Sequence, residues 1–251
     1  MSRQLFARTP GLKDTVTTYC SGCGHGVAHR LLAEAIEESG ARERTVAVAP
    51  VGCAVYGYDY WNFDTTEAAH GRTPAVAAAI KRVLPDRLVI SYQGDGDLAS
   101  IGLAEIMHAA NRGDRITVIF INNTNYGMTG GQMAPTTLAG QVTTTTPLGR
   151  DSATTGQPLK VAELLATLPG VKYAARGALH KPGLVRKAKS LIQKALAVQE
   201  AGLGFSVVEL VSLCPTNWGL TTLQSVELVE KQIVPVFPLG VFKDESGAKA
   251  E

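Results

Sequence analysis

The chain alternates between short apolar runs and segments with helical periodicity, and this alternation limits the folds it can adopt. Apolar residues recur at helical spacing between the runs, and Gly40 and Gly113 are suitable helix C-caps. Five apolar runs are predicted strands, at residues 45–49, 88–92, 116–121, 171–175 and 205–213. Six predicted helices cover residues 27–36, 73–84, 99–111, 160–168, 183–200 and 221–233. The pattern predicts an α/β fold with a doubly wound, mostly parallel sheet.

No repeat, low-complexity linker or composition shift divides the sequence, so one domain over residues 1–251 is expected. Residues 1–18 show little periodicity, and the charged tail from about 243 to 251 is expected to fray. The aromatic segment 56–70 is equally compatible with a loop packed on the core and with a functional lid. The long loop 126–157 is uncommon in a compact domain unless it is functional or covered by a partner.

Charge and hydropathy exclude several classes of protein. Lys and Arg number 24 against 22 Asp and Glu, a net charge of +2, which gives no general argument for nucleic acid or a membrane surface. No apolar run is long enough to span a bilayer, and the N-terminus lacks the apolar core of a secretory signal. A cytoplasmic protein is therefore expected, in which the cysteines are thiolates rather than disulfides.

Two polar clusters follow successive predicted strands. The turn 94–97 (GDGD) comes after the run 88–92, and the cluster 122–125 (NNTN) closes the run 116–121. The carboxyl ends of parallel strands share one edge, where ligands of open α/β sheets bind. An acid such as Asp95 fits a phosphate site when a divalent cation lies between them, and the asparagines could supply further oxygen ligands.

Other nucleotide and metal motifs fit this turn less well. Residues 94–99 formally match the dinucleotide fingerprint, but Asp95 would repel a bare pyrophosphate, and the next strand ends in Asn122 rather than a ribose-binding acid. A Walker lysine is missing, and Ala99 stands where a calcium loop needs Asp or Asn. A diphosphate bound through a divalent metal ion is therefore the remaining interpretation of this turn.

The four cysteines form a second candidate site. Cys20 and Cys23 form a CxxC pair, and Cys53 and Cys214 each come shortly after the end of a predicted strand. Four thiolates are the ligand set of a [4Fe–4S] cluster, and a Cys₄ zinc site has the same count. Buried thiols without a ligand are a third possibility.

Asp95 and the asparagine pair that ends at Asn123 are similar to the thiamine diphosphate signature. Five further stretches, in the same order, resemble the β subunit of 2-oxoacid:ferredoxin oxidoreductases. These stretches are residues 19–26, 51–53, 70–72, 126–132 and 214–217. The resemblance covers roughly residues 15–220, and it implies a thiamine diphosphate-binding fold.

The resemblance also assigns residues to roles. It implies that Mg²⁺ is bound by Asp95, Asn123 and the carbonyl of Asn125, and that a [4Fe–4S] cluster is held by the four cysteines. His70, Arg72 and Met128 are candidates for the surroundings of the thiazolium. The residues implied to line the cofactor are Gly24, His25, Val51, Gly52, Cys53, Gly94, Asp95, Gly96, Asp97, Asn123, Asn125, Tyr126, Gly127, Met128 and Thr129.

The activity implied is oxidative decarboxylation of a 2-oxoacid to acyl-CoA and CO₂, with electrons passed through the cluster to ferredoxin. An α subunit would bring the pyrimidine-binding domain and its carboxylate, and further subunits the coenzyme A-related and ferredoxin-like modules. The loop after Asn125 offers no cation for a distal carboxylate, which favours 2-oxoisovalerate over 2-oxoglutarate. A non-redox thiamine-dependent decarboxylase and a zinc-stapled binding module are the competing classes.

Overall fold

A seven-stranded sheet forms the centre of the protein in the computed structural model, which describes residues 7–247. Its strand order is β2-β1-β3-β4-β8-β7-β9. All neighbouring strands are parallel except β9, which runs antiparallel to β7. The strands are β1 (Thr45–Ala49), β2 (Asp64–Glu67), β3 (Leu88–Gly94), β4 (Thr117–Asn122), β7 (Val171–Ala178), β8 (Phe205–Val211) and β9 (Gly240–Asp244). The predicted doubly wound α/β fold is confirmed.

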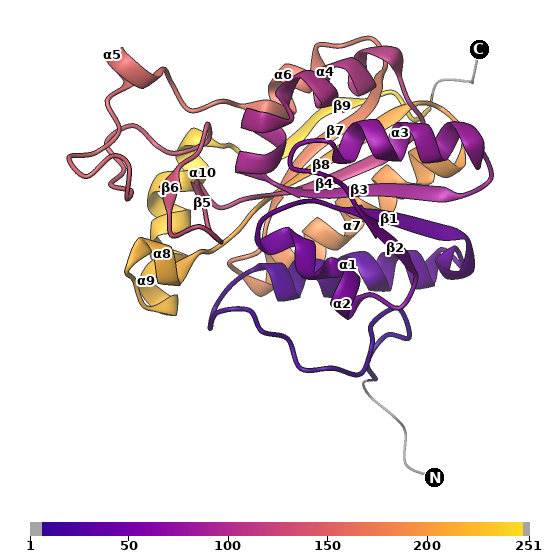
Figure 1. Cartoon of the computed structure of the whole chain (residues 1–251), viewed down its shortest axis with the longest axis horizontal. Coiled ribbons are helices and arrows are strands. Elements are labelled where there is room, and N and C mark those ends of the chain that lie inside the picture. Colours follow the sequence, from indigo (N-terminus) through magenta and orange to yellow (C-terminus); the bar gives the residue numbers. More distant parts are fainter. Residues whose placement is uncertain (1–6, 248–251) are drawn as a thin grey trace.

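Helices cover both faces of this sheet (Figure 1). One face packs against α1 (His25–Glu38) and α7 (Pro182–Glu200), and the other against α3 (Thr73–Val83), α4 (Leu103–Arg112) and α6 (Val161–Ala166). The apolar stripe of each helix faces the buried strands, because burial of that stripe is the main stabilisation available to an amphipathic helix. The predicted helices thus lie close to their predicted positions.

Short elements complete the structure. They are η1 (Arg42–Arg44), η2 (Cys53–Tyr56), α2 (Gly57–Tyr60), η3 (Asp97–Ile101), β5 (Asn125–Tyr126), β6 (Gln132–Met133), α5 (Ser152–Thr155), α8 (Pro215–Trp218), α9 (Thr222–Leu228), η4 (Val229–Ile233) and α10 (Val234–Val236). The helix predicted at 221–233 is therefore α9 followed by the π-helical turn η4. A small third core beside it contains Leu138, Ile233 and Phe237.

Both edge strands correct the sequence-based interpretation. Residues 64–67, expected to be irregular, form β2 beside β1, although they are polar and mostly exposed. Lys243 and Asp244, placed in the fraying tail, belong to β9 and pair with Ala174 and Tyr173. Edge strands need only one hydrogen-bonded neighbour and little burial, so they leave no apolar run to detect. The rest of the expected tail, 248–251, and residues 1–6 lie outside the described residues.

The aromatic segment is largely packed on the core rather than forming a lid. Trp61 is fully buried and Tyr60 nearly so, whereas Tyr58 is exposed. The ring centroid of Trp61 lies 4.7 Å from that of His29 and 5.1 Å from that of Tyr92. The N-terminal stretch crosses this region, where Leu12 forms an isolated β-bridge with Trp61.

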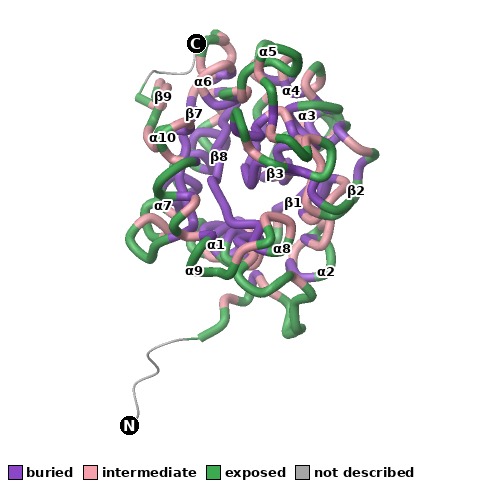
Figure 2. Tube along the Cα trace, turned by 90° about the vertical axis from the view of Figure 1, so that its left-hand side faces the viewer, coloured by how far each residue is buried: buried purple, intermediate pink, exposed green. Residues whose placement is uncertain are grey.

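The long loop is held by one buried arginine. The guanidinium of Arg150 donates to the carbonyl oxygens of Ala134, Pro135 and Thr137 at 3.4, 3.0 and 2.5 Å. It also reaches the carbonyl oxygens of Thr155 and Gln157. A single cation therefore ties both ends of residues 134–157 together, while much of the segment is exposed (Figure 2). No helix within residues 7–247 combines the length and the hydropathy required to cross a bilayer.

Candidate functional site

A cavity of about 100 Å³ lies at the carboxyl ends of β1, β3 and β4. It brings together both polar clusters that follow the predicted strands. The residues that line it are His25, Val51, Gly52, Cys53, Ala54, His70, Gly94, Asp95, Gly96, Asp97, Asn123, Asn125, Tyr126, Gly127, Met128 and Thr129. Of the fifteen residues expected to contact the cofactor, Gly24 alone is outside this lining.

Asp95 is buried at the floor of the cavity, 2% exposed. Its Oδ1 accepts from the backbone N–H of Gly96 at 2.8 Å, and its Oδ2 accepts from the N–H of Thr124 at 2.9 Å and from Oγ1 of Thr136 at 2.5 Å. Burial raises the pKa of Asp95 to about 7, although these hydrogen bonds act in the opposite direction. An adjacent divalent cation would stabilise the ionised carboxylate, so its environment suits a metal ligand.

Asn123 and Asn125 add oxygen atoms beside this carboxylate. Oδ1 of Asn125 is buried without a hydrogen-bond partner, and Oδ1 of Asn123 receives one long bond, 3.4 Å, from the N–H of Asn125. A buried oxygen without a partner is costly unless a ligand satisfies it. Carboxylate and amide oxygens are the ligands that Mg²⁺ prefers, so this donor set fits the ion. The unsatisfied oxygen of Asn125 is in its side chain, whereas the sequence-based assignment named its backbone carbonyl.

Three glycines line the cavity at positions where a larger side chain would change its shape or its packing. A Cβ on Gly96 would lie 2.4 Å from the ring of Tyr126, whose hydroxyl donates to the Gly96 carbonyl at 3.0 Å. A Cβ on Gly94 would meet nothing within 4 Å, because it would point into the open cavity. Gly52 has φ 101°, a conformation that other residues rarely adopt.

Asp97 lines the cavity, but its oxygens already have partners. Its Oδ1 forms an ion pair with Nδ1 of His70 and accepts from the N–H of Gly71 at 2.8 Å. Its Oδ2 accepts from Nε2 of Gln93 at 2.5 Å. Asp97 therefore orients the imidazole of His70, a role that its place in the motif did not indicate.

Arg72 is a candidate residue that the structure does not bring into the cavity lining. Its guanidinium lies outside the cavity lining, where it pairs with Glu105 and donates to the carbonyl of Ile101 at 3.2 Å. Arg72 occupies the N-cap position of α3 without a side-chain capping bond, and both of its partners lie in or next to α4. His70, two residues earlier, lines the cavity.

Gly24 likewise lies outside the cavity lining. A Cβ there would lie 1.9 Å from Oγ of Ser212, so this glycine allows the turn to pack against the end of β8. His25 does line the cavity, with Nδ1 2.9 Å from the hydroxyl of Tyr92 and its ring stacked on Tyr19 at 5.2 Å. Burial lowers the pKa of His25 to about 4, so its imidazole is neutral at pH 7.

Comparison with known proteins agrees with this geometry. The family model described as thiamine pyrophosphate enzyme, C-terminal TPP binding domain, matches residues 45–210. The 2-oxoglutarate synthase subunit KorB of Archaeoglobus fulgidus is 38% identical over 201 residues, which are 80% of this chain and 71% of that protein. The chain belongs to the thiamine diphosphate-binding subunits of the 2-oxoacid:ferredoxin oxidoreductases.

Two further relatives extend the comparison within this family. The ketoisovalerate oxidoreductase subunit VorA of Methanothermobacter thermautotrophicus is 48% identical over 242 residues, which are 96% of this chain and 51% of that protein. The solved 2-oxoglutarate:ferredoxin oxidoreductase of Magnetococcus marinus, with 2-oxoglutarate, coenzyme A and succinyl-CoA bound, superimposes with a TM-score of 0.78 at 25% identity. That match covers 96% of this chain and 86% of the other. The chain thus spans about half the length of the VorA protein it matches.

The four cysteines of this family member are free thiols, and Cys53 is the one that the cavity lining includes. The sulfurs of Cys53 and Cys214 lie 3.3 and 3.7 Å from the position that a Cβ on Gly127 would take. Burial raises the pKa of Cys23 to about 12, with further contributions from the charges of Cys214, Cys53 and Cys20. Burial likewise raises the pKa of Cys53 to about 11, with Cys214 and Cys20 contributing. Burial is the main cause in both cases, and the neighbouring thiols add to it.

Such mutual repulsion disfavours the thiolate forms unless a cation is bound between them, and iron or zinc would supply that charge. Within residues 7–247, no three His, Cys, Asp or Glu side chains converge so as to share one metal ion. The four cysteines also differ in exposure: Cys20 is exposed, Cys23 and Cys53 are half-buried, and Cys214 is buried.

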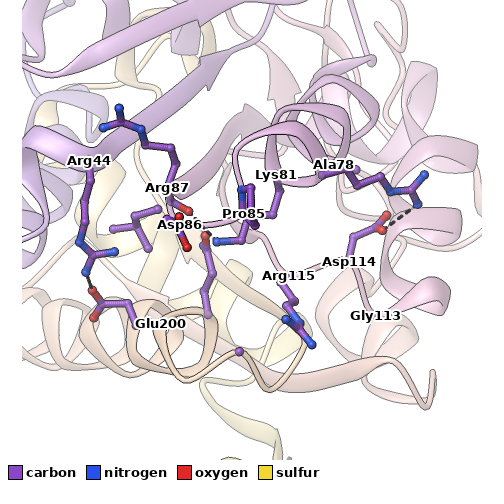
Figure 3. Close-up of a pocket in the computed structure, with 14 residues that line it drawn as sticks. Arg44, Ala78, Lys81, Pro85, Asp86, Arg87, Gly113, Asp114, Arg115 and Glu200 are labelled. Atoms are coloured by element: carbon purple, nitrogen blue, oxygen red, sulfur yellow. Dashed lines mark hydrogen bonds and ion pairs between the residues drawn. The ribbon is translucent and has the colours of Figure 1, made fainter.

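A larger cavity, about 610 Å³, lies at the amino ends of β1, β3 and β4, opposite the candidate site (Figure 3). Several of its cations have structural partners: Arg44 pairs with Glu200, Arg82 with Asp114, and Lys81 donates to a backbone carbonyl. Helices α3, α4 and α7 end here, and basic side chains offset the partial negative charge of helix C-termini. This cavity contains none of the site residues expected from the sequence.

Proposed function

We propose that this chain is the thiamine diphosphate-binding, cluster-bearing subunit of an enzyme that converts a 2-oxoacid, coenzyme A and oxidised ferredoxin to acyl-CoA, CO₂ and reduced ferredoxin. The observation that carries the proposal is one cavity region with two sets of donors: buried oxygen atoms on Asp95, Asn123 and Asn125, and the thiols of Cys53 and Cys214, whose sulfurs lie within 4 Å of one point beside Gly127. A thiamine-dependent decarboxylase without redox function would need the first set and gain nothing from the second.

The oxygen set would hold Mg²⁺ and, through it, the diphosphate. Asp95, Asn123 and Asn125 are the ligands, with the remaining positions left to phosphate oxygens and water. Thr136 and the backbone N–H of Thr124 fix the carboxylate. Thiamine diphosphate, when bound, supplies the ring that stabilises the carbanion formed as CO₂ leaves.

The chain's own side chains would then position the reacting groups. The space beside Gly52 and Gly94 leaves room for the cofactor, since a Cβ at either position would meet no protein atom within 4 Å. His70, oriented by Asp97, lies at the cavity wall and can hold or move a proton there. The neutral imidazole of His25 adds no positive charge next to a cationic thiazolium.

The four thiols would hold a [4Fe–4S] cluster beside this cavity. Such a cluster takes one thiolate on each of four irons, so its ligands surround a core rather than share a single ion. Cys53 lines the proposed thiamine cavity and is also one of the proposed cluster ligands, so the two cofactors would be neighbours. A short distance between them suits transfer of single electrons.

A partner chain must complete the site. The carboxylates of the lining are Asp95 and Asp97, and both are already engaged, so neither is free for the aminopyrimidine ring. We assign that carboxylate to an α subunit with a pyrimidine-binding domain, and electron transfer onward to a ferredoxin-like module. The loop 126–157, with Val142 and Leu148 exposed, is the proposed surface for the α subunit. Free thiols and a reducible cluster suit a cytoplasmic enzyme.

Branched-chain 2-oxoacids such as 2-oxoisovalerate are the favoured substrates. The part of the cavity wall that residues 7–247 provide contains Met128 and no Lys or Arg, so it offers no partner for a second carboxylate. The VorA relative is named for ketoisovalerate. The KorB relative and the solved structure are named for 2-oxoglutarate, which makes that dicarboxylate the second candidate.

The test uses the full chain purified anaerobically with the subunits that accompany it. Acyl-CoA formation with a panel of 2-oxoacids should require thiamine diphosphate and Mg²⁺, and iron and sulfide should each be present at about four per chain beyond the content of the partner subunits. Zinc without iron in a fully loaded sample would contradict the redox function. Greater turnover of 2-oxoglutarate than of 2-oxoisovalerate would reassign the substrate.

A further inference from the structure

Asn217 lies beside the most buried of the four cysteines, and sequence reasoning gave it no role. Its Nδ2 is 2.7 Å from the carbonyl oxygen of Gly127 and 3.4 Å from Sγ of Cys214. A carbonyl oxygen can only accept, so the amide nitrogen, and not its oxygen, must face Gly127. The same nitrogen carries a second hydrogen, which is directed to the sulfur.

The surrounding backbone fixes this side chain in place. Gly131 has φ 83°, and a Cβ there would lie 3.1 Å from Cβ of Asn217. Gly127 leaves space on the other side, where a Cβ would lie 3.6 Å from Nδ2 of Asn217 and 3.3 Å from the sulfur of Cys53. The amide is therefore held between two glycines of one loop, and its geometry toward Cys214 has little freedom.

More than one polar group acts on Cys214. Burial raises the pKa of Cys214, and polar groups of Asn217 and Asn125 act in the opposite direction. The side chain of Asn125 acts on both parts of the site: it lowers the pKa of Cys214, and its Oδ1 is the buried oxygen without a partner near Asp95. Cys20, by contrast, is exposed to solvent.

We propose that Asn217 is a positioning residue that sets the reduction potential of the cluster through an N–H···S hydrogen bond to Cys214. The inference rests on the proposed function, because it requires the [4Fe–4S] cluster at these thiols. Adding one electron places more negative charge on the sulfurs, so a donor stabilises the reduced form more than the oxidised form. Asn217 therefore raises the potential and makes the cluster a better electron acceptor.

The test is a potentiometric titration followed by electron paramagnetic resonance on the full chain with its accompanying subunits. Asn217→Leu keeps the approximate shape and removes the donor, and Asn217→Asp replaces the N–H by an oxygen. Thr216→Val, an exposed neighbour on the same short helix, is the matched control. Iron and sulfide are measured in every sample, so that loss of the cluster is separated from a change in its potential.

The expected result is a more negative midpoint in both Asn217 variants, with iron content and the control unchanged. At the wild-type midpoint, the ratio of reduced to oxidised cluster should fall roughly fivefold, the effect of one net hydrogen bond. The nitrogen coupling of a ¹⁵N-asparagine-labelled sample to the reduced cluster should also weaken in Asn217→Leu.

Full iron loading with an unchanged midpoint in both variants would overturn the inference and leave the proposed function intact. Loss of iron from both variants, with the control fully loaded, would also overturn it, in favour of a role in cluster assembly. Wild-type protein without iron would refute the proposed function itself.

Discussion

The hydroxyl of Thr136 donates a hydrogen bond of 2.5 Å to Oδ2 of Asp95, across 41 positions of the chain. Thr136 is fully buried, and it lies in the loop that Arg150 ties together. The long loop therefore supports the carboxylate from behind, in addition to any surface it offers a partner. A residue that supports a ligand in this way is expected to affect metal affinity without touching the metal.

Thr136→Val should weaken magnesium-dependent thiamine diphosphate binding by about 10- to 100-fold, because it removes a donor to the ionised form of Asp95. Isothermal titration of the assembled enzyme measures this. Thr144→Val, at an exposed position of the same loop, should bind as the wild type does. Equal affinities for the two variants would show that the hydrogen bond contributes nothing.

Asp95→Ala should abolish magnesium-dependent cofactor binding, with an affinity loss of more than about 100-fold, since it removes a direct ligand. Asp97→Asn is the matched comparison, two positions away in the same turn. It should keep the dependence on magnesium, because its carboxylate is bonded to His70, Gly71 and Gln93. Unchanged affinity in Asp95→Ala would refute the magnesium assignment.

The two glycines of the turn should respond differently to alanine. Gly96→Ala pushes a methyl group into the Tyr126 ring, so the free energy of unfolding should fall by about 1–3 kcal/mol. Gly94→Ala meets no protein atom and should change stability by less than about 0.5 kcal/mol. Its methyl group would nevertheless occupy the cavity and weaken cofactor binding. Urea unfolding and cofactor titration of both variants distinguish these effects, and full cofactor affinity in Gly94→Ala would contradict the placement.

His70 and Arg72 provide a second contrast. His70→Gln should lower kcat by at least about tenfold, because it removes an imidazole that Asp97 orients at the cavity wall. Arg72→Ala should change kcat by less than about twofold and stability by less than about 1 kcal/mol, since it loses a half-exposed ion pair with Glu105. Steady-state kinetics of the assembled complex measures kcat for both variants. A larger loss of kcat in Arg72→Ala than in His70→Gln would show that Arg72 acts in the site.

Acid should destabilise the chain through His29. Its ring is buried against Trp61 and Tyr92, and burial, with a contribution from His25, holds the pKa of His29 well below its ordinary value. The unfolded chain protonates near pH 6.5 while the folded chain does not, so this stability is present above that pH and is lost as the pH falls below it. Between pH 7.5 and 5.5 the loss from this residue is about 1.4 kcal/mol.

Urea unfolding of the wild type and of His29→Gln at both pH values measures how much stability His29 loses in acid. The variant starts from a lower stability because a buried ring is lost, but its decline with acid should be smaller by the same amount. Parallel declines in the two proteins would assign the acid sensitivity to other groups.

The sequence determined the central sheet and the oxygen site, because both depend on residues close together in the chain. Apolar runs of β-branched residues are buried strands wherever helices cover both faces, so β1, β3, β4, β7 and β8 were predictable. The turn 94–97 and the cluster 122–125 follow two neighbouring parallel strands, and parallel pairing alone places them side by side. The edge strands β2 and β9 escaped detection because pairing with β1 and β7, rather than burial, holds them in place.

The tertiary structure decided which neighbouring side chains reach the site. His70 and Arg72 are two positions apart, yet the start of α3 directs one to the cavity and the other to Glu105. The sequence assigns no role to Thr136 or Asn217, because their partners lie 41 positions away in Asp95 and 90 away in Gly127. Such contacts form only when the sheet and loops are assembled, since they depend on distances in space rather than on order along the chain.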